Sequence, residues 1–210
     1  NHELLRQVAE EEAAKYGVEL LYRDFRPWFR QGQDKARELG HATPYLPQDA
    51  GAIQIAAGSG LNLDGAIDAA TTRGGRGGRL DIAADNIAVV AQSQAAQTAG
   101  GAVQLIAEQL NALNVASLSL GGLRSSRDDG VDLTVSANSI QLGRDAQLFG
   151  QEYILSARQD ISLAQGAGIT AAGGGSDAGG DRPVYRVQGD AAFLRVSGDR
   201  QVDLRREGAE

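Results

Sequence analysis

The spacing of apolar residues divides the chain into two parts. In the first part apolar side chains recur every three or four residues, which is the spacing of one helix face. Its clearest members are Leu5, Val8, Ala9, Ala13 and Tyr16. Pro27 is expected to start a second helical piece, and Pro44 and Pro47 mark a joint. Beyond this joint, short alternating runs bounded by Gly, Asn and Asp are typical of strands. The pattern predicts a short α-helical segment over residues 1–45, serving as a cap or connector, and a β region over 46–210.

One five-residue phrase recurs in the β region. It has apolar residues at its first and third positions and a small residue at its fifth. Its occurrences begin at Ile53, Leu80, Val103, Leu133, Tyr153 and Leu194. The small residue falls at positions 57, 84, 107, 137, 157 and 198, so the intervals are 27, 23, 30, 20 and 41 residues. A coil of about 20 residues suits a right-handed parallel β-helix, in which short strands stack on the coil below. We therefore predict a mainly β fold, a right-handed parallel β-helix (solenoid) of about six coils.

This register also predicts which side chains face inward. Val135, Leu155 and Val196 are each the second apolar residue of the phrase, so we expect all three in the core, with the small residue at the bend of each coil. The structural alternative is a leucine-rich repeat. Its consensus is matched by a single stretch, residues 110–120.

Composition removes several classes of function. The chain has 20 Lys and Arg against 27 Asp and Glu, a formal net charge of −7, which argues against a generally basic nucleic-acid binder. It has no Cys, so disulfides, Cys-based zinc sites and thiol nucleophiles are excluded, and its only imidazoles are His2 and His41. The longest uncharged stretch, 86–107, is too polar to span a bilayer. Because Met is absent, we expect a fragment or a mature form of a longer product.

Carboxylates are the main candidates for chemistry. Polysaccharide-cleaving β-helices place Asp clusters on neighbouring coils, and several Asp residues here have a compatible spacing. They are Asp64, Asp68, Asp81, Asp85, Asp128, Asp129 and Asp132. Asp is equally suited to the turns between strands, where its side chain bonds the local backbone. We interpret these residues as turn residues, and predict no catalytic, metal-binding or cofactor-binding residue.

Arginine-rich and aromatic stretches offer two binding alternatives. Arg73, Arg76 and Arg79 are separated by Gly pairs, as in RNA-binding tracts, but without interleaved aromatic residues they favour an exposed loop. In the helical part, basic residues surround Trp28, which would suit a partner-binding or membrane-surface helix as well as a cap. His41 has no second ligand nearby in the sequence and is expected to be a linker residue.

Three short phrases resemble a known family. Residues 157–163 (ARQDISL), 143–146 (GRDA) and 166–169 (GAGI) are similar to the repeats of filamentous-haemagglutinin-like exoproteins, which bacterial two-partner systems secrete. The resemblance covers about residues 51–205. It implies an extracellular or cell-surface location, an outer-membrane transporter for the full-length protein, and a host-cell or neighbouring-bacterium surface ligand.

These observations favour a noncatalytic structural or adhesive segment of a large bacterial exoprotein, of the adhesin or contact-dependent-inhibition class, that acts as a rigid solenoid stalk. Two alternatives remain open. One is a polysaccharide-active β-helix enzyme, and the other is a module that binds a protein partner through its helical insert. Neither nucleic-acid binding nor membrane insertion is expected.

Overall fold

The computed structural model describes residues 26–41, 49–63, 65, 67, 69, 77–95, 101–113, 115–127, 129–172, 184–198 and 201–208. The chain forms two compact units, Asn1–Pro47 and Gln48–Glu210. Each unit is described by itself.

The N-terminal unit contributes one described helix, α2 (Arg26–Glu38). Pro27 occupies its first turn, as predicted, because a proline there lacks only an N–H that has no partner within the helix. The helix ends at Glu38, and Gly40 follows with a φ of 67°, which glycine adopts easily. The backbone N–H of Gly40 bonds to the carbonyl of Arg37, and that of His41 bonds to the carbonyl of Ala36. This pair of bonds is a Schellman motif, so His41 has a local backbone role at the helix end.

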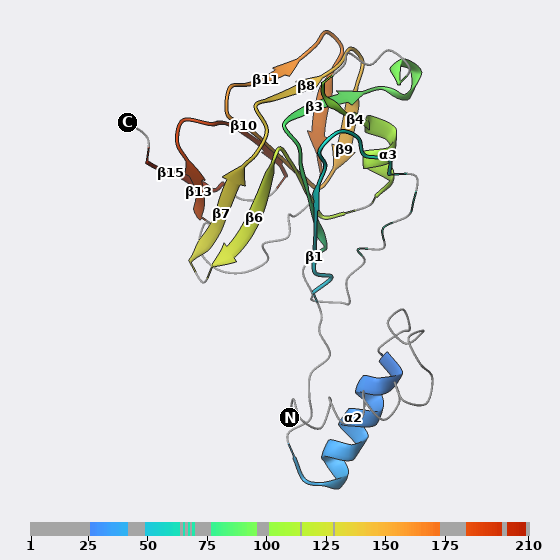
Figure 1. The fold of residues 1–210 in the computed structure, drawn as a ribbon. Coiled ribbons are helices and arrows are strands. Elements are labelled where there is room, and N and C mark those ends of the chain that lie inside the picture. The colour runs from blue at the N-terminus through green and yellow to red at the C-terminus, as the bar shows by residue number, and fades with distance from the viewer. Residues whose placement is uncertain are drawn as a thin grey trace. The chain divides into compact units, whose positions relative to one another are not determined.

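The second unit is mainly β, as predicted (Figure 1). Its described strands are β1 (Ala52–Ala56), β2 (Arg79–Ala83), β3 (Asn86–Val90), β4 (Val103–Ile106), β5 (Ser117–Leu120), β6 (Gly122–Arg127), β7 (Gly130–Val135), β8 (Ser139–Leu142), β9 (Gln147–Gly150), β10 (Glu152–Ala157), β11 (Asp160–Leu163), β12 (Gly168–Ala171), β13 (Val184–Gln188), β14 (Ala192–Ser197) and β15 (Asp203–Glu207). A 3₁₀ turn, η2 (Gln92–Gln94), and a short helix, α3 (Ala107–Ala112), lie on either side of β4. Neither described α-helix is long and apolar enough to cross a membrane.

The strands form four sheets. Sheet A has the order β1-β2-β5-β10-β14, sheet B the order β11-β8-β3-β4, sheet C the order β15-β13-β7-β6, and sheet D pairs β12 with β9. All described pairs are parallel except β10 with β14 and β6 with β7. The prevalence of parallel pairs agrees with the prediction from the repeated phrase.

In the parallel sheets, apolar residues of one strand lie beside apolar residues of the next. In sheet A, Leu80 pairs with Leu118, and Leu118 pairs with Tyr153. In sheet B, Ile140 lies between Ile87 and Ile161. These columns meet the inward side chains of sheet D and α3 in one aliphatic cluster, which we call the inner core. Apart from Tyr153, small and branched side chains fill it, in columns set by the spacing of neighbouring strands.

One stretch of chain repeats without interruption. Ile161 lies beside Ile140, and Ile169 lies beside Leu148, so β11 and β12 each pair with a strand 21 positions earlier in the chain, β8 and β9 respectively. The predicted interval of 20 residues joined the phrases of β7 and β10, which lie in different sheets, so this interval is a different one.

Elsewhere the repeat is interrupted by an inserted hairpin. β5 ends at Leu120, and β8 begins only at Ser139. Between them β6 and β7 form an antiparallel pair that joins β13 and β15 in sheet C. Residues of sheet C bury a second, smaller apolar cluster against the outward side of sheet A, where Ile154 packs with Leu133 and Tyr185. We call this region the outer layer.

The six occurrences of the phrase do not occupy equivalent positions. Those in β1, β2 and β10 lie in parallel register in sheet A, but the occurrence in β4 lies in sheet B and the one in β7 lies in sheet C. The occurrence in β14 pairs antiparallel. The prediction that the six phrases mark six equivalent coils was wrong. The short phrase describes any half-buried strand and carries no information about which strand pairs with it.

Leu155 lies in the inner core and is fully buried, as predicted. Val135 belongs instead to the outer layer, where it is partly buried. Val196 is partly buried in β14, opposite Tyr153 in an antiparallel pair. The strand that the phrase missed is β5, which fills the place in sheet A between β2 and β10. It lies within the stretch that also spells a leucine-rich repeat.

Candidate functional site

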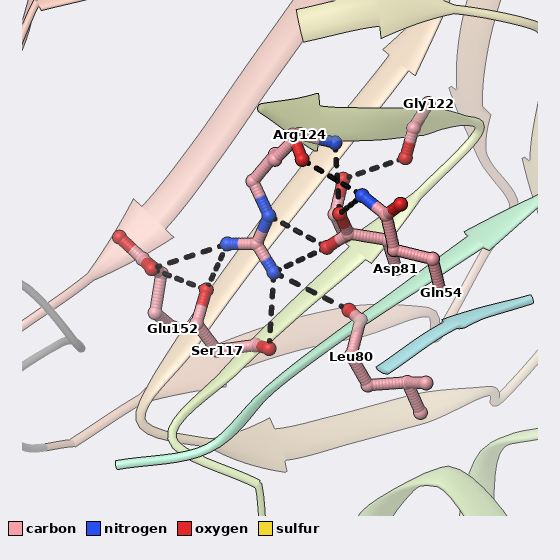
Figure 2. A network of polar contacts seen from close by, with 8 residues as sticks. Gln54, Leu80, Asp81, Ser117, Gly122, Arg124 and Glu152 are labelled. Atoms are coloured by element: carbon pink, nitrogen blue, oxygen red, sulfur yellow. Dashed lines mark hydrogen bonds and ion pairs between the residues drawn. The ribbon is translucent and has the colours of Figure 1, made fainter. Parts of the chain in front are cut away.

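The most concentrated chemistry in the described residues is a buried network of charged side chains between sheet A and β6 (Figure 2). Its centre is Arg124, which is 3% exposed, and Asp81, which is 1% exposed. The Nε atom of Arg124 donates to Oδ1 of Asp81 at 2.6 Å, and Nη2 lies 2.6 Å from the same oxygen. The backbone N–H of Arg124 donates to Oδ2 of Asp81 at 2.8 Å. One carboxylate therefore fixes both the side chain and the backbone of β6.

A second carboxylate lies on the other side of the guanidinium group. Oε2 of Glu152 is 3.9 Å from Nη1 of Arg124, and the Ser117 hydroxyl bridges the two by accepting from Arg124 and donating to Glu152. Oε1 of Glu152 accepts from Nε of Arg195 at 2.7 Å and lies 2.6 Å from its Nη2. The network alternates in charge, with two carboxylates and two guanidinium groups.

Sheet geometry places these side chains. Asp81 lies between Leu80 and Ile82 in β2, and alternate residues of a strand point to opposite faces, so it projects away from the inner core. Gln54 projects from the same face of β1, and its Nε2 atom donates to Oδ2 of Asp81 at 3.2 Å and to the carbonyl oxygen of Arg124 at 2.7 Å. The network thus joins strands from β1 to β14 to the hairpin.

The arrangement is suited to holding structure. A buried ion is stabilised only when its charge is paired and its hydrogen-bonding groups are satisfied, and Asp81 and Arg124 meet both conditions. The Ser117 hydroxyl donates to a carboxylate and is fully buried, so it is poorly placed to attack a substrate. The network fixes how the hairpin lies on sheet A, because its bonds are directional in a way that apolar contacts are not.

A second charged cluster lies on sheet C around Arg186 of β13. Its guanidinium group lies 2.5 Å from Oδ2 of Asp129, 3.7 Å from Oδ1 of Asp132 and 3.7 Å from Oε1 of Glu207. Arg127 of β6 also pairs with Asp132. The side chains of Asp129 and Glu207 are 70% and 62% exposed, so solvent screens these pairs and each contributes little to stability.

The structure separates the carboxylates that the sequence grouped. Asp81 is buried between sheets, whereas Asp85 is exposed in the bend between β2 and β3, where its carbonyl accepts from the N–H of Asn138. Only Asp129 and Asp132 share a partner, Arg186. Asp64, Asp68 and Asp128 lie outside the described residues. The turn interpretation is therefore wrong for Asp81, whose role is to pair a buried arginine.

The other sequence candidates are placed only in part. Arg79 begins β2, while Arg73 and Arg76 lie outside the described residues, as do His2 and the side chain of Trp28. His41 is exposed. Among the described residues, no three His, Asp or Glu side chains are grouped so as to hold a metal ion.

A neutral polar contact closes one strand edge. Asn111 of α3 donates from Nδ2 to the carbonyl of Gln147 at 2.9 Å, and its Oδ1 accepts from the N–H of Phe149 at 2.9 Å. The side-chain amide thus bonds to β9 as a neighbouring strand would. Its Oδ1 also accepts the Tyr153 hydroxyl at 3.2 Å, and burial raises the pKa of Tyr153 from 10.0 to about 12.

Sequence reasoning missed Arg124, Glu152 and Arg195. One signal was available: Tyr153, Ile154 and Leu155 are consecutive apolar residues without alternation, which indicates a strand buried on both faces. A charged residue beside such a run needs a buried partner of opposite charge. Nothing in the sequence identifies that partner, because Arg124 is separated from Glu152 by 28 residues and by three intervening strands.

Comparison of the chain with protein-family models, with characterised proteins and with solved structures returned no match.

Proposed function

We propose that this chain is a noncatalytic structural segment of a large bacterial exoprotein, in which the strands from β1 to β12, apart from the inserted hairpin of β6 and β7, form a right-handed parallel β-helix that acts as a rigid spacer. The observation that carries the proposal is the 21-residue interval that separates β8 from β11 in sheet B and also β9 from β12 in sheet D. A constant interval in two sheets is what a chain winding through successive coils produces. In sheet A this β-helix has four parallel levels, from β1 to β10, in place of the six coils expected from the phrase.

The buried network supports the same proposal. It joins side chains of β1, β2, β5, β10 and β14 to β6, so several levels of sheet A are linked by directional bonds in addition to their apolar columns. Cross-links of this kind resist sliding or bending of one level over the next. A rigid spacer needs this property. The charged groups that provide it are paired with one another inside the protein.

The cellular setting rests on the resemblance of residues 143–169 to filamentous-haemagglutinin-like repeats. In that setting the segment is displayed outside the cell or at its surface, in a protein of the adhesin or contact-dependent-inhibition class. The full-length protein would cross the outer membrane through a dedicated transporter and meet a ligand on a host cell or a neighbouring bacterium. The segment would hold the binding or toxic module at a distance from its own cell.

Rigidity can be measured directly because the chain has no native Cys. Spin labels on Ser59→Cys and Ser162→Cys would sit at exposed positions near the two ends of the proposed β-helix. A rigid spacer predicts one narrow distribution of label-to-label distance in pulsed electron paramagnetic resonance. A broad or two-peaked distribution in the folded protein would contradict it. The control pair, Ser139→Cys with Ser162→Cys, spans one level within sheet B and calibrates the width due to the labels.

The enzyme alternative needs a separate assay. The chain would be incubated with pectin, alginate and glycosaminoglycans, with and without Ca²⁺, and reducing ends and unsaturated products would be followed. We expect no product. Asp81→Asn is a poor diagnostic variant because Asp81 is structural, so Asp85→Asn and Asp132→Asn are the variants to compare. Product formation that either substitution abolishes would favour the enzyme over the spacer.

A further inference from the structure

The strand β1 lies at the edge of sheet A and pairs with β2 alone among the described strands. Its place in the stack leaves the apolar column uncovered: Ile53 is 43% exposed, whereas Leu80 and Leu118 in the same column are 0% and 1% exposed. An uncharged edge strand without proline is a ready template for another strand. The open edge of β1 therefore calls for a partner strand.

The hydrogen bonds between β1 and β2 determine which residues of β1 direct their N–H and C=O groups to the open edge. The carbonyl of Gly51 accepts from Arg79, and the N–H of Ala57 donates to Ala83, so the odd-numbered residues bond to β2. In a parallel pair each residue directs its N–H and C=O to the same side, and successive residues alternate. The backbone groups of Ala52, Gln54 and Ala56 consequently point to the open edge.

The sequence of β1 is self-complementary. It reads Ala-Ile-Gln-Ile-Ala, which is identical in both directions. Two copies running antiparallel about a two-fold axis at Gln54 would place Ala52 opposite the partner's Ala56 and Ile53 opposite the partner's Ile55. All three pairs with outward backbone groups would then exchange hydrogen bonds, and both Ile pairs would lie on the face that belongs to the inner core.

Charge separates β1 from another open edge, that of β15 in sheet C. The sequence of β15 is Asp-Leu-Arg-Arg-Glu. Antiparallel self-pairing there would set Asp203 opposite the partner's Glu207 and Arg205 opposite the partner's Arg205. Like charges directly opposite each other destabilise a strand pair, whereas β1 carries no charge at all.

We propose that β1 is a homodimerisation strand, through which a second copy of this chain extends sheet A in antiparallel register centred on Gln54. A two-fold interface requires one surface to be complementary to itself, and the palindromic, uncharged β1 meets that requirement. The pairing also places the partner's Ile55 beside Ile53, which is 43% exposed in the single chain. The proposal does not depend on the exoprotein assignment.

Charge exchange tests the interface. A52K/A56K introduces Lys at two exposed positions and, in the proposed register, sets Lys opposite Lys; A52E/A56E does the same with Glu. Sedimentation equilibrium of the full chain is expected to show a dimer, and each double variant is expected to raise the dimer dissociation constant at least about tenfold. An equimolar mixture of the two variants should restore dimers. The melting temperature of each variant, measured at a dilution where wild type is monomeric, should match wild type.

Disulfide trapping tests the register. Residues 52 and 56 are opposite each other in the proposed dimer, while two copies of residue 52 are four positions apart, about 13 Å along the strand. A mixture of Ala52→Cys and Ala56→Cys chains should therefore cross-link under mild oxidation faster than either variant alone. The proposal is overturned if the wild-type chain stays monomeric, if the charge variants dimerise as wild type does, or if each Cys variant alone cross-links as fast as the mixture.

Discussion

The two faces of sheet A are buried by different chemistry. Toward sheets B and D, β2, β5 and β10 present aliphatic columns in which every level repeats the one beside it. Toward sheet C, the same strands present Asp81, Ser117 and Glu152, which are held by Arg124 and Arg195. The inner core repeats similar aliphatic contacts from strand to strand. The outer layer consists of individual ion pairs and hydrogen bonds that do not repeat.

This difference separates two ways of stabilising a sheet. Burial of aliphatic side chains contributes roughly 1.5–3 kcal/mol for each side chain and tolerates changes of shape that conserve volume. A buried ion pair contributes little net free energy compared with an apolar pair, but loss of one partner leaves a charge without solvent or counter-ion. The inner core therefore supplies most of the stability of the unit, and the outer layer specifies where the inserted hairpin lies.

The largest effect is expected from a charge introduced into the inner core. Leu155→Asp buries a carboxylate among Leu120, Leu194 and other apolar neighbours and should cost at least several kcal/mol, comparable with the whole stability of a domain. Urea denaturation followed by circular dichroism should show a lost or strongly shifted transition. The control is Leu163→Asp at the end of the stack, where 46% exposure lets water reach the carboxylate. Equal midpoints for the two variants would show that the columns are misassigned.

The next effect is expected in the outer layer. Arg124→Met removes the partner of Asp81 and should cost roughly 3–5 kcal/mol of unfolding free energy. The double variant Asp81→Leu with Arg124→Met should be more stable than Arg124→Met alone, because it no longer buries an unpaired aspartate. Denaturant unfolding of the wild type, both single variants and the double variant gives the coupling free energy. Additive effects would mean that the ion pair does not hold the hairpin.

A smaller effect is expected at the corner where the hairpin leaves sheet A. Gly121 has a φ of 87°, and a Cβ atom there would lie 2.1 Å from the backbone oxygen of Ser156. Gly51 has a φ of 85° but nothing within 4 Å of a Cβ. Gly51→Ala should therefore cost about 1 kcal/mol from backbone strain alone, and Gly121→Ala clearly more. Thermal unfolding of both variants isolates the clash. Similar melting temperatures would refute the close approach of the hairpin corner to β10.

The smallest effect concerns pH. Tyr153 is 3% exposed, and its pKa is about 12 in the folded chain against 10.0 ordinarily. The hydroxyl is neutral in both states below pH 10, so its contribution is complete there. Above pH 10 the unfolded chain loses the proton first, and stability falls as the pH rises to about 12. The difference in unfolding free energy between wild type and Tyr153→Phe should shrink over this interval. A difference independent of pH would place Tyr153 in contact with solvent.

Much of the inner core could be predicted from the sequence. The repeated phrase in β1, β2 and β10 identified three strands that lie in parallel register in sheet A, and Leu155 was correctly placed in the core. The candidate site could not be predicted in the same way. Asp81 was noticed as a carboxylate, but its partner Arg124 lies in a hairpin whose sequence, Gly-Leu-Arg-Ser-Ser-Arg, has no apolar alternation to identify a face.

The sequence by itself determined that the chain after the joint is mainly β, because alternation with a period of two and glycine at the turns are properties of neighbouring residues. Only the tertiary structure decided that Val135 and Val196 leave the parallel stack, that β5 takes a place in it, and that Arg124 joins Asp81 to Glu152. Each of these depends on which strands lie side by side, and strand pairing is settled by contacts between residues far apart in the chain.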